Sequence, residues 1–98
     1  MQRQDIITKL RENEAALRAR GVTHAALFGS RARGDNREDS DIDILIEIAP
    51  GSVPDIYTYV GLKRWIAELF PGEVDVVDRA ALKPAVRPHA ELDTISVF

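Results

Sequence analysis

The stretch from Phe28 to Glu47 reads FGSRARGDNREDSDIDILIE, and it decides the fold that the rest of the chain is expected to adopt. A Gly-Ser pair ends an apolar run, a loop rich in both charges follows, and Asp41 and Asp43 then open a strand of isoleucines. Isoleucines at alternate positions from 42 to 48 predict a β-strand over residues 41–48, because strand side chains alternate between two faces. Asp41 and Asp43 would therefore stand together on the face opposite the isoleucines.

The segments on either side of this stretch predict the remaining secondary structure. Apolar residues at helical spacing predict a helix over 3–19 and a second over 53–70, the latter with Ser52 as its N-cap and Pro54 in its first turn. Short apolar runs predict strands over 22–28 and 73–78. A third helix is expected after Asp78, weakened by Pro84 and Pro88, with a short strand over 95–98. This order predicts an α/β (α+β) fold in which helices flank a small mixed sheet.

Composition limits the classes of protein to which the chain can belong. Its 98 residues predict one domain over 1–98, and a hydrophobic content of 45% is typical of a globular protein. The formal net charge of −3 gives no reason to expect duplex nucleic acid as a partner. There is no cysteine, no apolar run near the ~20 residues of a membrane helix and no signal-peptide core. We therefore expect a cytoplasmic protein without a membrane partner.

Three carboxylates predict a metal site. Neighbouring carboxylates such as Asp41 and Asp43 repel one another, and a divalent cation relieves the repulsion. Carboxylate oxygens are ligands that Mg²⁺ prefers. Asp75 lies among strand valines, and if its strand lies beside residues 41–48, the three carboxylates converge. Such a patch can hold two metal ions about 3.5–4 Å apart, the spacing used for phosphoryl or nucleotidyl transfer.

The Gly29-Ser30 turn is the predicted phosphate-binding element. Glycine lets backbone N–H groups approach a phosphate, and the serine hydroxyl can donate a hydrogen bond. Arg31, Arg33 and Arg37 follow as candidates for neutralising phosphate charge.

These elements occur in an order that resembles a known superfamily. GSRARG at 29–34, five intervening residues, SDIDI at 40–44 and the later VDVV at 74–77 together resemble the signature of the polymerase-β-type nucleotidyltransferases. The short chain is similar, more narrowly, to the minimal nucleotidyltransferases, including the MntA-like antitoxins encoded with HEPN-type toxins. The resemblance is close over residues 20–78 and general elsewhere, and it implies the nucleotidyltransferase fold.

The resemblance also implies roles for individual residues. Gly29 and Ser30 would hold the triphosphate of ATP, the nucleotide donor, and Arg31 and Arg33 would assist them. Asp41 and Asp43 would ligate two Mg²⁺ ions. Asp75 would complete one metal site and help to deprotonate the attacking hydroxyl, so that pyrophosphate leaves the α-phosphorus.

Plainer interpretations of the same residues stay open. Asp75 could be an edge-strand charge that blocks aggregation, Ser30 a turn residue, and Arg33 the partner of Asp35 or Asp39. We expect Glu47 to be peripheral to the metal site and Asp78 to be a helix cap; no role is assigned to Arg79.

Aromatic and histidine side chains have plain interpretations too. His24 is expected to be a packed histidine with a satisfied ring, and His89 to lie at the surface. Leu62 and Trp65 are expected in the core, or in a protein interface if they lie on the outer side of their helix.

Three functions are compatible with the sequence. The first is transfer of AMP to a hydroxyl of a partner protein, because a 98-residue chain has little room for domains that grip an acceptor. The resemblance to MntA-like antitoxins implies that this partner is a HEPN toxin and that the hydroxyl is that of a tyrosine. The second is an antitoxin that masks its partner without catalysis. The third is transfer to a small molecule such as an aminoglycoside, which would require further structure around the acceptor.

Overall fold

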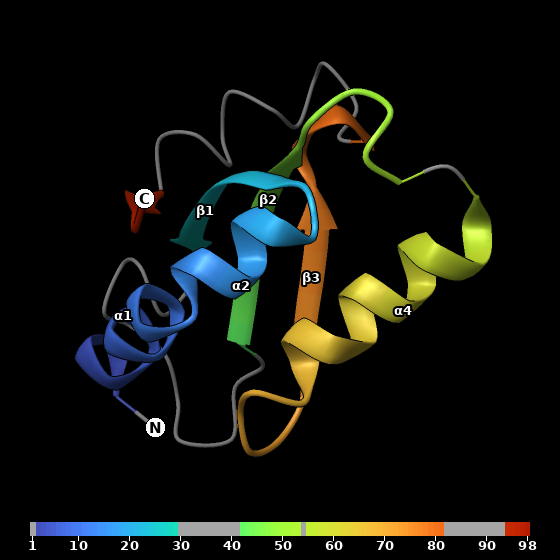
Figure 1. Ribbon diagram of the computed structural model, residues 1–98. Helices are drawn as coiled ribbons and strands as arrows, with labels where there is room; N and C mark the ends of the chain where they lie inside the picture. The colour runs from blue at the N-terminus through green and yellow to red at the C-terminus, as the bar shows by residue number, and fades with distance from the viewer. Residues whose placement is uncertain (1, 30–41, 54, 82–93) are drawn as a thin grey trace.

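The computed structural model describes residues 2–29, 42–53, 55–81 and 94–98. It has the predicted class, a mixed sheet flanked by helices (Figure 1). The elements in chain order are α1 (Arg3–Glu12), α2 (Glu14–Ala19), β1 (Val22–Phe28), β2 (Ile42–Ile48), α4 (Ile56–Ala67), β3 (Val74–Asp78), the 3₁₀ helix η1 (Arg79–Ala81) and β4 (Ile95–Ser96).

The N-terminal helix is divided in two, where the sequence predicted a single helix over 3–19. The division falls at Asn13, whose side-chain amide donates to the carbonyl of Lys9 at 2.8 Å. The backbone N–H of Asn13 also bonds to Lys9 and to Leu10, at 3.3 and 3.2 Å. An asparagine that bonds to the preceding turn competes with the regular helical ladder, which explains the interruption.

The four strands form one sheet in the order β3-β2-β1-β4. Strand β1 runs antiparallel to both β2 and β4, whereas β2 and β3 are parallel. The predicted strands over 22–28, 41–48, 73–78 and 95–98 are thus confirmed within the described residues, with small changes at their ends. Among the strands of this sheet, β3 and β4 lie at its two edges.

The helices pack on one face of the sheet, and the core lies between them (Figure 1). Ile42, Ile44 and Ile46 of β2 point into this core and are at most 2% exposed. Burial of an isoleucine side chain stabilises the fold by about 1.5–3 kcal/mol. The alternate residues of β2, Asp43 and Glu47 among them, therefore lie on the opposite face, which we call the carboxylate face.

Helix α4 begins later than the sequence predicted. Its N-cap is Asp55, whose Oδ1 accepts the backbone N–H of Thr58 at 2.7 Å, so the prediction of Ser52 was wrong. Ser52 instead closes the preceding turn by donating its backbone N–H to Ala49 at 3.1 Å. The bonds from the start of α4 hold the pKa of Asp55 below its ordinary value. Pro54 lies outside the described residues.

Helix α4 buries only part of its apolar surface. Leu62 and Ile66 are buried against the sheet, at 3% and 0% exposure, so Leu62 is a core residue and not an interface residue. Trp65 is half-buried beneath the guanidinium of Arg20, 4.2 Å from the ring centroid. Ile56, the first residue of the helix, is 64% exposed.

Candidate active site

Two aspartates from neighbouring strands form the centre of the candidate site. In the parallel pairing of β2 with β3, Asp43 lies directly opposite Asp75. Paired residues of adjacent strands project from the same face and lie about 4.8 Å apart. Asp43 is half-buried and Asp75 is exposed. The expectation that the strand of Asp75 lies beside residues 41–48 is therefore confirmed for Asp43.

Gly29 lies against this pair, immediately after β1. Its φ of +76° belongs to the left-handed region, which is unfavourable for residues other than glycine. A Cβ built on Gly29 would lie 2.5 Å from Oδ2 of Asp43, closer than real Cβ atoms come to a neighbour. The absence of a side chain at position 29 thus leaves the space in which the Asp43 carboxylate sits. Gly29 and Asp43 form one structural unit although 14 positions separate them in the sequence.

The other predicted site residues lie outside the described residues. These are Ser30, Arg31, Arg33, Arg37 and Asp41, together with the interpretations offered for Asp35, Asp39 and His89. Within the described part of the chain, no three metal-ligating side chains cluster. Asp43 and Asp75 nevertheless form a pair of hard oxygen ligands, and Mg²⁺ is commonly held by one or two protein carboxylates. The donors that the structure brings together fit a magnesium ion.

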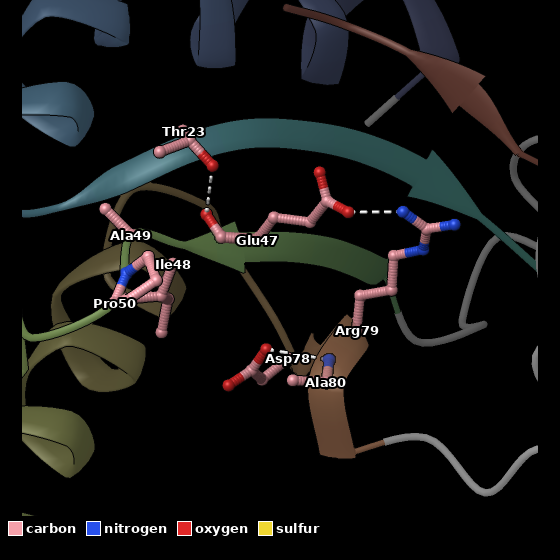
Figure 2. A pocket seen from close by; sticks show the side chains of 8 residues that line it. All are labelled: Thr23, Glu47, Ile48, Ala49, Pro50, Asp78, Arg79 and Ala80. Carbon is pink, nitrogen blue, oxygen red and sulfur yellow. Dashed lines mark hydrogen bonds and ion pairs between the residues drawn. The ribbon is translucent and has the colours of Figure 1, made fainter.

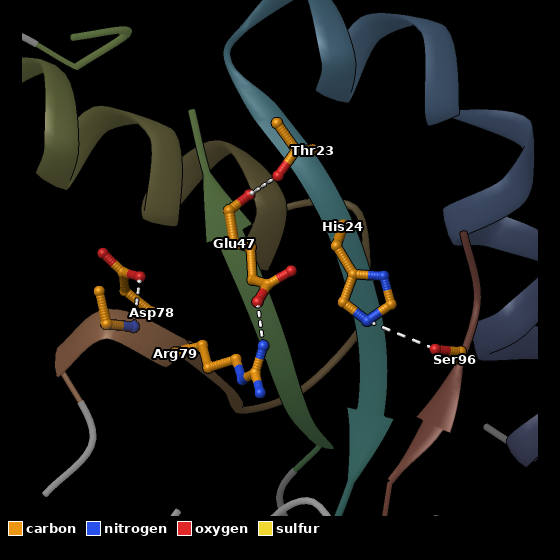
Figure 3. Close-up of polar contacts among 7 residues, drawn as sticks. Thr23, His24, Glu47, Asp78, Arg79 and Ser96 are labelled. Atoms are coloured by element: carbon orange, nitrogen blue, oxygen red, sulfur yellow. Dashed lines mark hydrogen bonds and ion pairs between the residues drawn. The ribbon is translucent and has the colours of Figure 1, made fainter. Parts of the chain in front are cut away.

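A second group of polar residues occupies the carboxylate face further along the strands. Glu47 lies four residues beyond Asp43, about 13 Å away at the rise of a strand, and forms an ion pair with Arg79 (Figure 3). Glu47 is thus engaged away from the aspartate pair, in agreement with its predicted peripheral position. Sequence reasoning missed this use of Arg79. The strand register could have indicated this ion pair. Asp43 and Asp75, which are paired across the two strands, are 32 positions apart in the sequence, and so are Glu47 and Arg79.

The Glu47–Arg79 pair borders a hollow of about 520 Å³ at the end of β2 and β3 (Figure 2). Thr23 stands on its other side and donates its hydroxyl to the backbone carbonyl of Glu47 at 3.2 Å. Asp78 accepts the backbone N–H of Ala80 at 3.0 Å, so the prediction of a cap is confirmed, although it caps the 3₁₀ helix η1. Burial, and to a smaller extent the negative charge of Asp78, raises the pKa of Tyr59 above its ordinary value.

His24 of strand β1 also lies on the carboxylate face, and it has a hydrogen-bonding partner. Its Nε2 lies 3.3 Å from the hydroxyl of Ser96 on β4 (Figure 3). His24 is half-buried. These observations agree with the expected structural role.

The fold and the aspartate pair together define a class of protein. The small mixed sheet, with paired carboxylates beside a glycine turn, is the arrangement that the sequence led us to expect of a nucleotidyltransferase domain. The model of the nucleotidyltransferase domain family matches residues 6–97, and the chain belongs to this family. It is accordingly an enzyme of the nucleotidyltransferase class.

Individual relatives support the same membership. The protein adenylyltransferase MntA of Thermococcus cleftensis is 32% identical over 85% of this chain and 83% of its own length. A solved structure provisionally described as a minimal nucleotidyltransferase is 27% identical, has a TM-score of 0.79, and shares 97% of this chain and 95% of its own.

One chain of a solved toxin–antitoxin complex has the same fold. The structure of the tri-AMPylated Shewanella oneidensis HEPN toxin with its MNT antitoxin matches 98% of this chain and 71% of the neighbour's, with a TM-score of 0.67. At 20% identity, this likeness shows the fold alone. In the described residues, no helix is both long and apolar enough to span a membrane.

Proposed function

We propose that this chain transfers AMP from ATP to a tyrosine hydroxyl of a partner HEPN-type toxin in the cytoplasm, and thereby acts as an antitoxin. The pairing of Asp43 with Asp75 beside Gly29 is the observation that carries the proposal. With divalent cations bound to its carboxylates, a site of this kind would bind the charged phosphates of a nucleotide, and a carboxylate can accept the proton of an attacking hydroxyl.

The reaction exchanges one phosphorus–oxygen bond for another. The acceptor hydroxyl oxygen bonds to the α-phosphorus of ATP, the bond from that phosphorus to the β-phosphate oxygen breaks, and pyrophosphate leaves. Asp75 accepts the hydroxyl proton, a role suited to its exposed position on the edge strand β3. The carboxylate of Asp43 occupies the space that a side chain at position 29 would need.

The oxygen donors of the site suit two magnesium ions. When bound, the ions supply positive charge that stabilises the phosphate oxygens as pyrophosphate departs. We assign the metal-ligating role to Asp41, Asp43 and Asp75. We assign the triphosphate-binding role to Gly29, Ser30, Arg31 and Arg33.

The partner is proposed from the names and complexes of similar proteins. The Thermococcus cleftensis relative is named a protein adenylyltransferase, and the Shewanella oneidensis neighbour is an antitoxin in complex with an AMPylated HEPN toxin. Carried over to this chain, these names favour a protein acceptor over a small molecule such as an aminoglycoside.

Intact-mass measurement of the partner tests the proposal. The chain is co-expressed with the HEPN-type protein that we expect to be encoded beside it, and the partner's mass should increase by one or more AMP units. Asp75→Asn should slow the transfer about 100- to 10,000-fold, the range for a lost acid–base group. Asp43→Asn should also slow the transfer, because it weakens a proposed metal ligand. Glu73→Gln is the matched control, because it neutralises an exposed carboxylate two residues before Asp75.

The outcomes separate catalysis from masking. A partner that stays unmodified in a tight complex would refute adenylyl transfer and favour a masking antitoxin. Neutralisation of the toxin that survives unchanged in an Asp41→Ala/Asp43→Ala double variant would show that catalysis is not the basis of the antitoxin effect.

A further inference from the structure

A groove of about 480 Å³ lies between helix α4 and strand β3, and we call it the α4–β3 groove. Its lining includes Ile56, Val60, Lys63 and Arg64 of the helix, and Asp75 of the strand. Asp75 belongs both to the groove lining and to the aspartate pair, whose carboxylates project from the sheet face opposite α4. The two sites therefore meet at the edge strand β3, and a chain segment bound in the groove would reach the proposed active centre around this edge.

The helix side of the groove is a continuous stripe that the fold itself does not bury. Positions 56, 60, 63, 64 and 67 recur at helical spacing and share one side of α4. The core stripe, which contains Leu62 and Ile66, lies on another side. Ile56 and Val60 are 64% and 48% exposed, and the adjacent Tyr57 is 87% exposed. Exposed apolar side chains grouped in this way are typical of a protein-binding surface.

The charges of the groove indicate the chemistry of its occupant. Lys63 and Arg64 place two cations beside the apolar stripe, against the one carboxylate of Asp75 in the groove lining, in a chain whose net charge is −3. The ammonium of Lys63 lies 5.5 Å from the ring centroid of Tyr59, which holds it over the groove lining. A complementary segment would carry apolar side chains and carboxylates.

We propose that the α4–β3 groove is the docking site of the acceptor protein, and that it binds an acidic segment with exposed apolar side chains so that the acceptor hydroxyl reaches Asp75. This inference rests on the proposed function, because it concerns the protein that receives the nucleotide. In the described sheet, β3 is an edge strand, so no other strand of that sheet covers the side of Asp75 that faces away from β2. A partner protein can approach Asp75 from that side.

Paired surface substitutions test the groove. Arg64→Glu reverses a groove charge, and Val60→Asp places a carboxylate on the apolar stripe. The matched controls are Arg11→Glu and Thr8→Asp, which make similar changes at exposed positions of α1. Circular dichroism melting identifies any variant that fails to fold. Calorimetric titration with the adjacent-gene HEPN-type protein then measures affinity, and intact mass measures AMP transfer.

We expect each groove variant to raise the Kd for the partner at least about tenfold, while the α1 controls leave it unchanged. The affinity of the wild-type chain should also fall with salt more steeply than that of Arg64→Glu, because fewer opposite charges remain to be screened in the variant. AMP transfer at subsaturating partner should fall in proportion to affinity.

The results distinguish failure of the groove from failure of the proposed function. Wild-type affinity and AMP transfer in both groove variants would overturn the groove while leaving the transfer reaction intact. Loss of affinity in these variants, with no AMP transferred even by the wild-type chain, would support the groove and refute the reaction. Absence of binding by the wild-type chain would overturn the groove. A change in self-association of the isolated chain without a change in partner affinity would assign the groove to a second copy and overturn the proposal.

Discussion

Replacement of Gly29 by alanine tests whether the glycine turn positions the carboxylate of Asp43. The added Cβ would lie 2.5 Å from Oδ2 of Asp43, and contacts under 3.0 Å are essentially never seen. The carboxylate must therefore retreat by at least about 0.5 Å, or the turn must open. Displacements near 1 Å in a catalytic site can lower the rate about 100-fold.

The same substitution carries a separate conformational cost. Alanine at a φ of +76° is strained by about 1–2 kcal/mol. Gly51→Ala is the matched control, because Gly51 has a φ of +79° and its added Cβ would meet nothing within 4 Å. Both variants should lose about 1–2 kcal/mol in the free energy of unfolding, and the loss at Gly29 should be the larger.

Activity separates the two variants. Gly29→Ala should lower kcat for AMP transfer about 100-fold, which corresponds to about 2.7 kcal/mol in the activation free energy, whereas Gly51→Ala should retain the wild-type rate. The measurements are urea denaturation for stability and mass spectrometry of the modified partner for rate. Equal activities of the two variants would refute the reasoning, because the contact with Asp43 is what distinguishes them.

Three further predictions concern residues outside the aspartate pair. Double-mutant cycles on Glu47 and Arg79 should give a coupling of only about 0.2–1 kcal/mol, since their side chains are 34% and 40% exposed; a coupling above 2 kcal/mol would contradict this. The lowered pKa of Asp55 contributes stability above the unfolded pKa of about 3.9 that is lost as pH falls through the lower folded pKa. Asp55→Ala should therefore lower the urea midpoint at pH 7 and weaken the acid dependence, and an unchanged midpoint would exclude the cap. The raised pKa of Tyr59 contributes stability below about pH 10 that is lost as pH rises through the higher folded pKa. Tyr59→Phe should remove the later component of the tyrosinate absorbance titration, and Asp78→Asn should move that component to lower pH; no movement would contradict the role of Asp78.

Local patterns predicted the strands better than the helix boundaries. The alternation of isoleucines in β2 specifies which side chains enter the core, and the structure buries Ile42, Ile44 and Ile46 as expected. Helix ends depend on which competing hydrogen bonds form. Asn13 interrupts the first helix through its bond to a preceding carbonyl, and Asp55 caps α4 while the predicted Ser52 closes a turn.

The sequence by itself determined the family, the alternation that separates Asp43 from the core, and the presence of a glycine at the turn. The tertiary structure decided that β2 and β3 are neighbours and parallel, with Asp43 opposite Asp75. It also decided that the Asp43 carboxylate occupies the space a side chain at position 29 would need. Periodicity records which face a residue occupies, but strand register depends on packing between segments about 30 residues apart. The aspartate pair and the α4–β3 groove therefore became visible only when the strands and the helix were assembled.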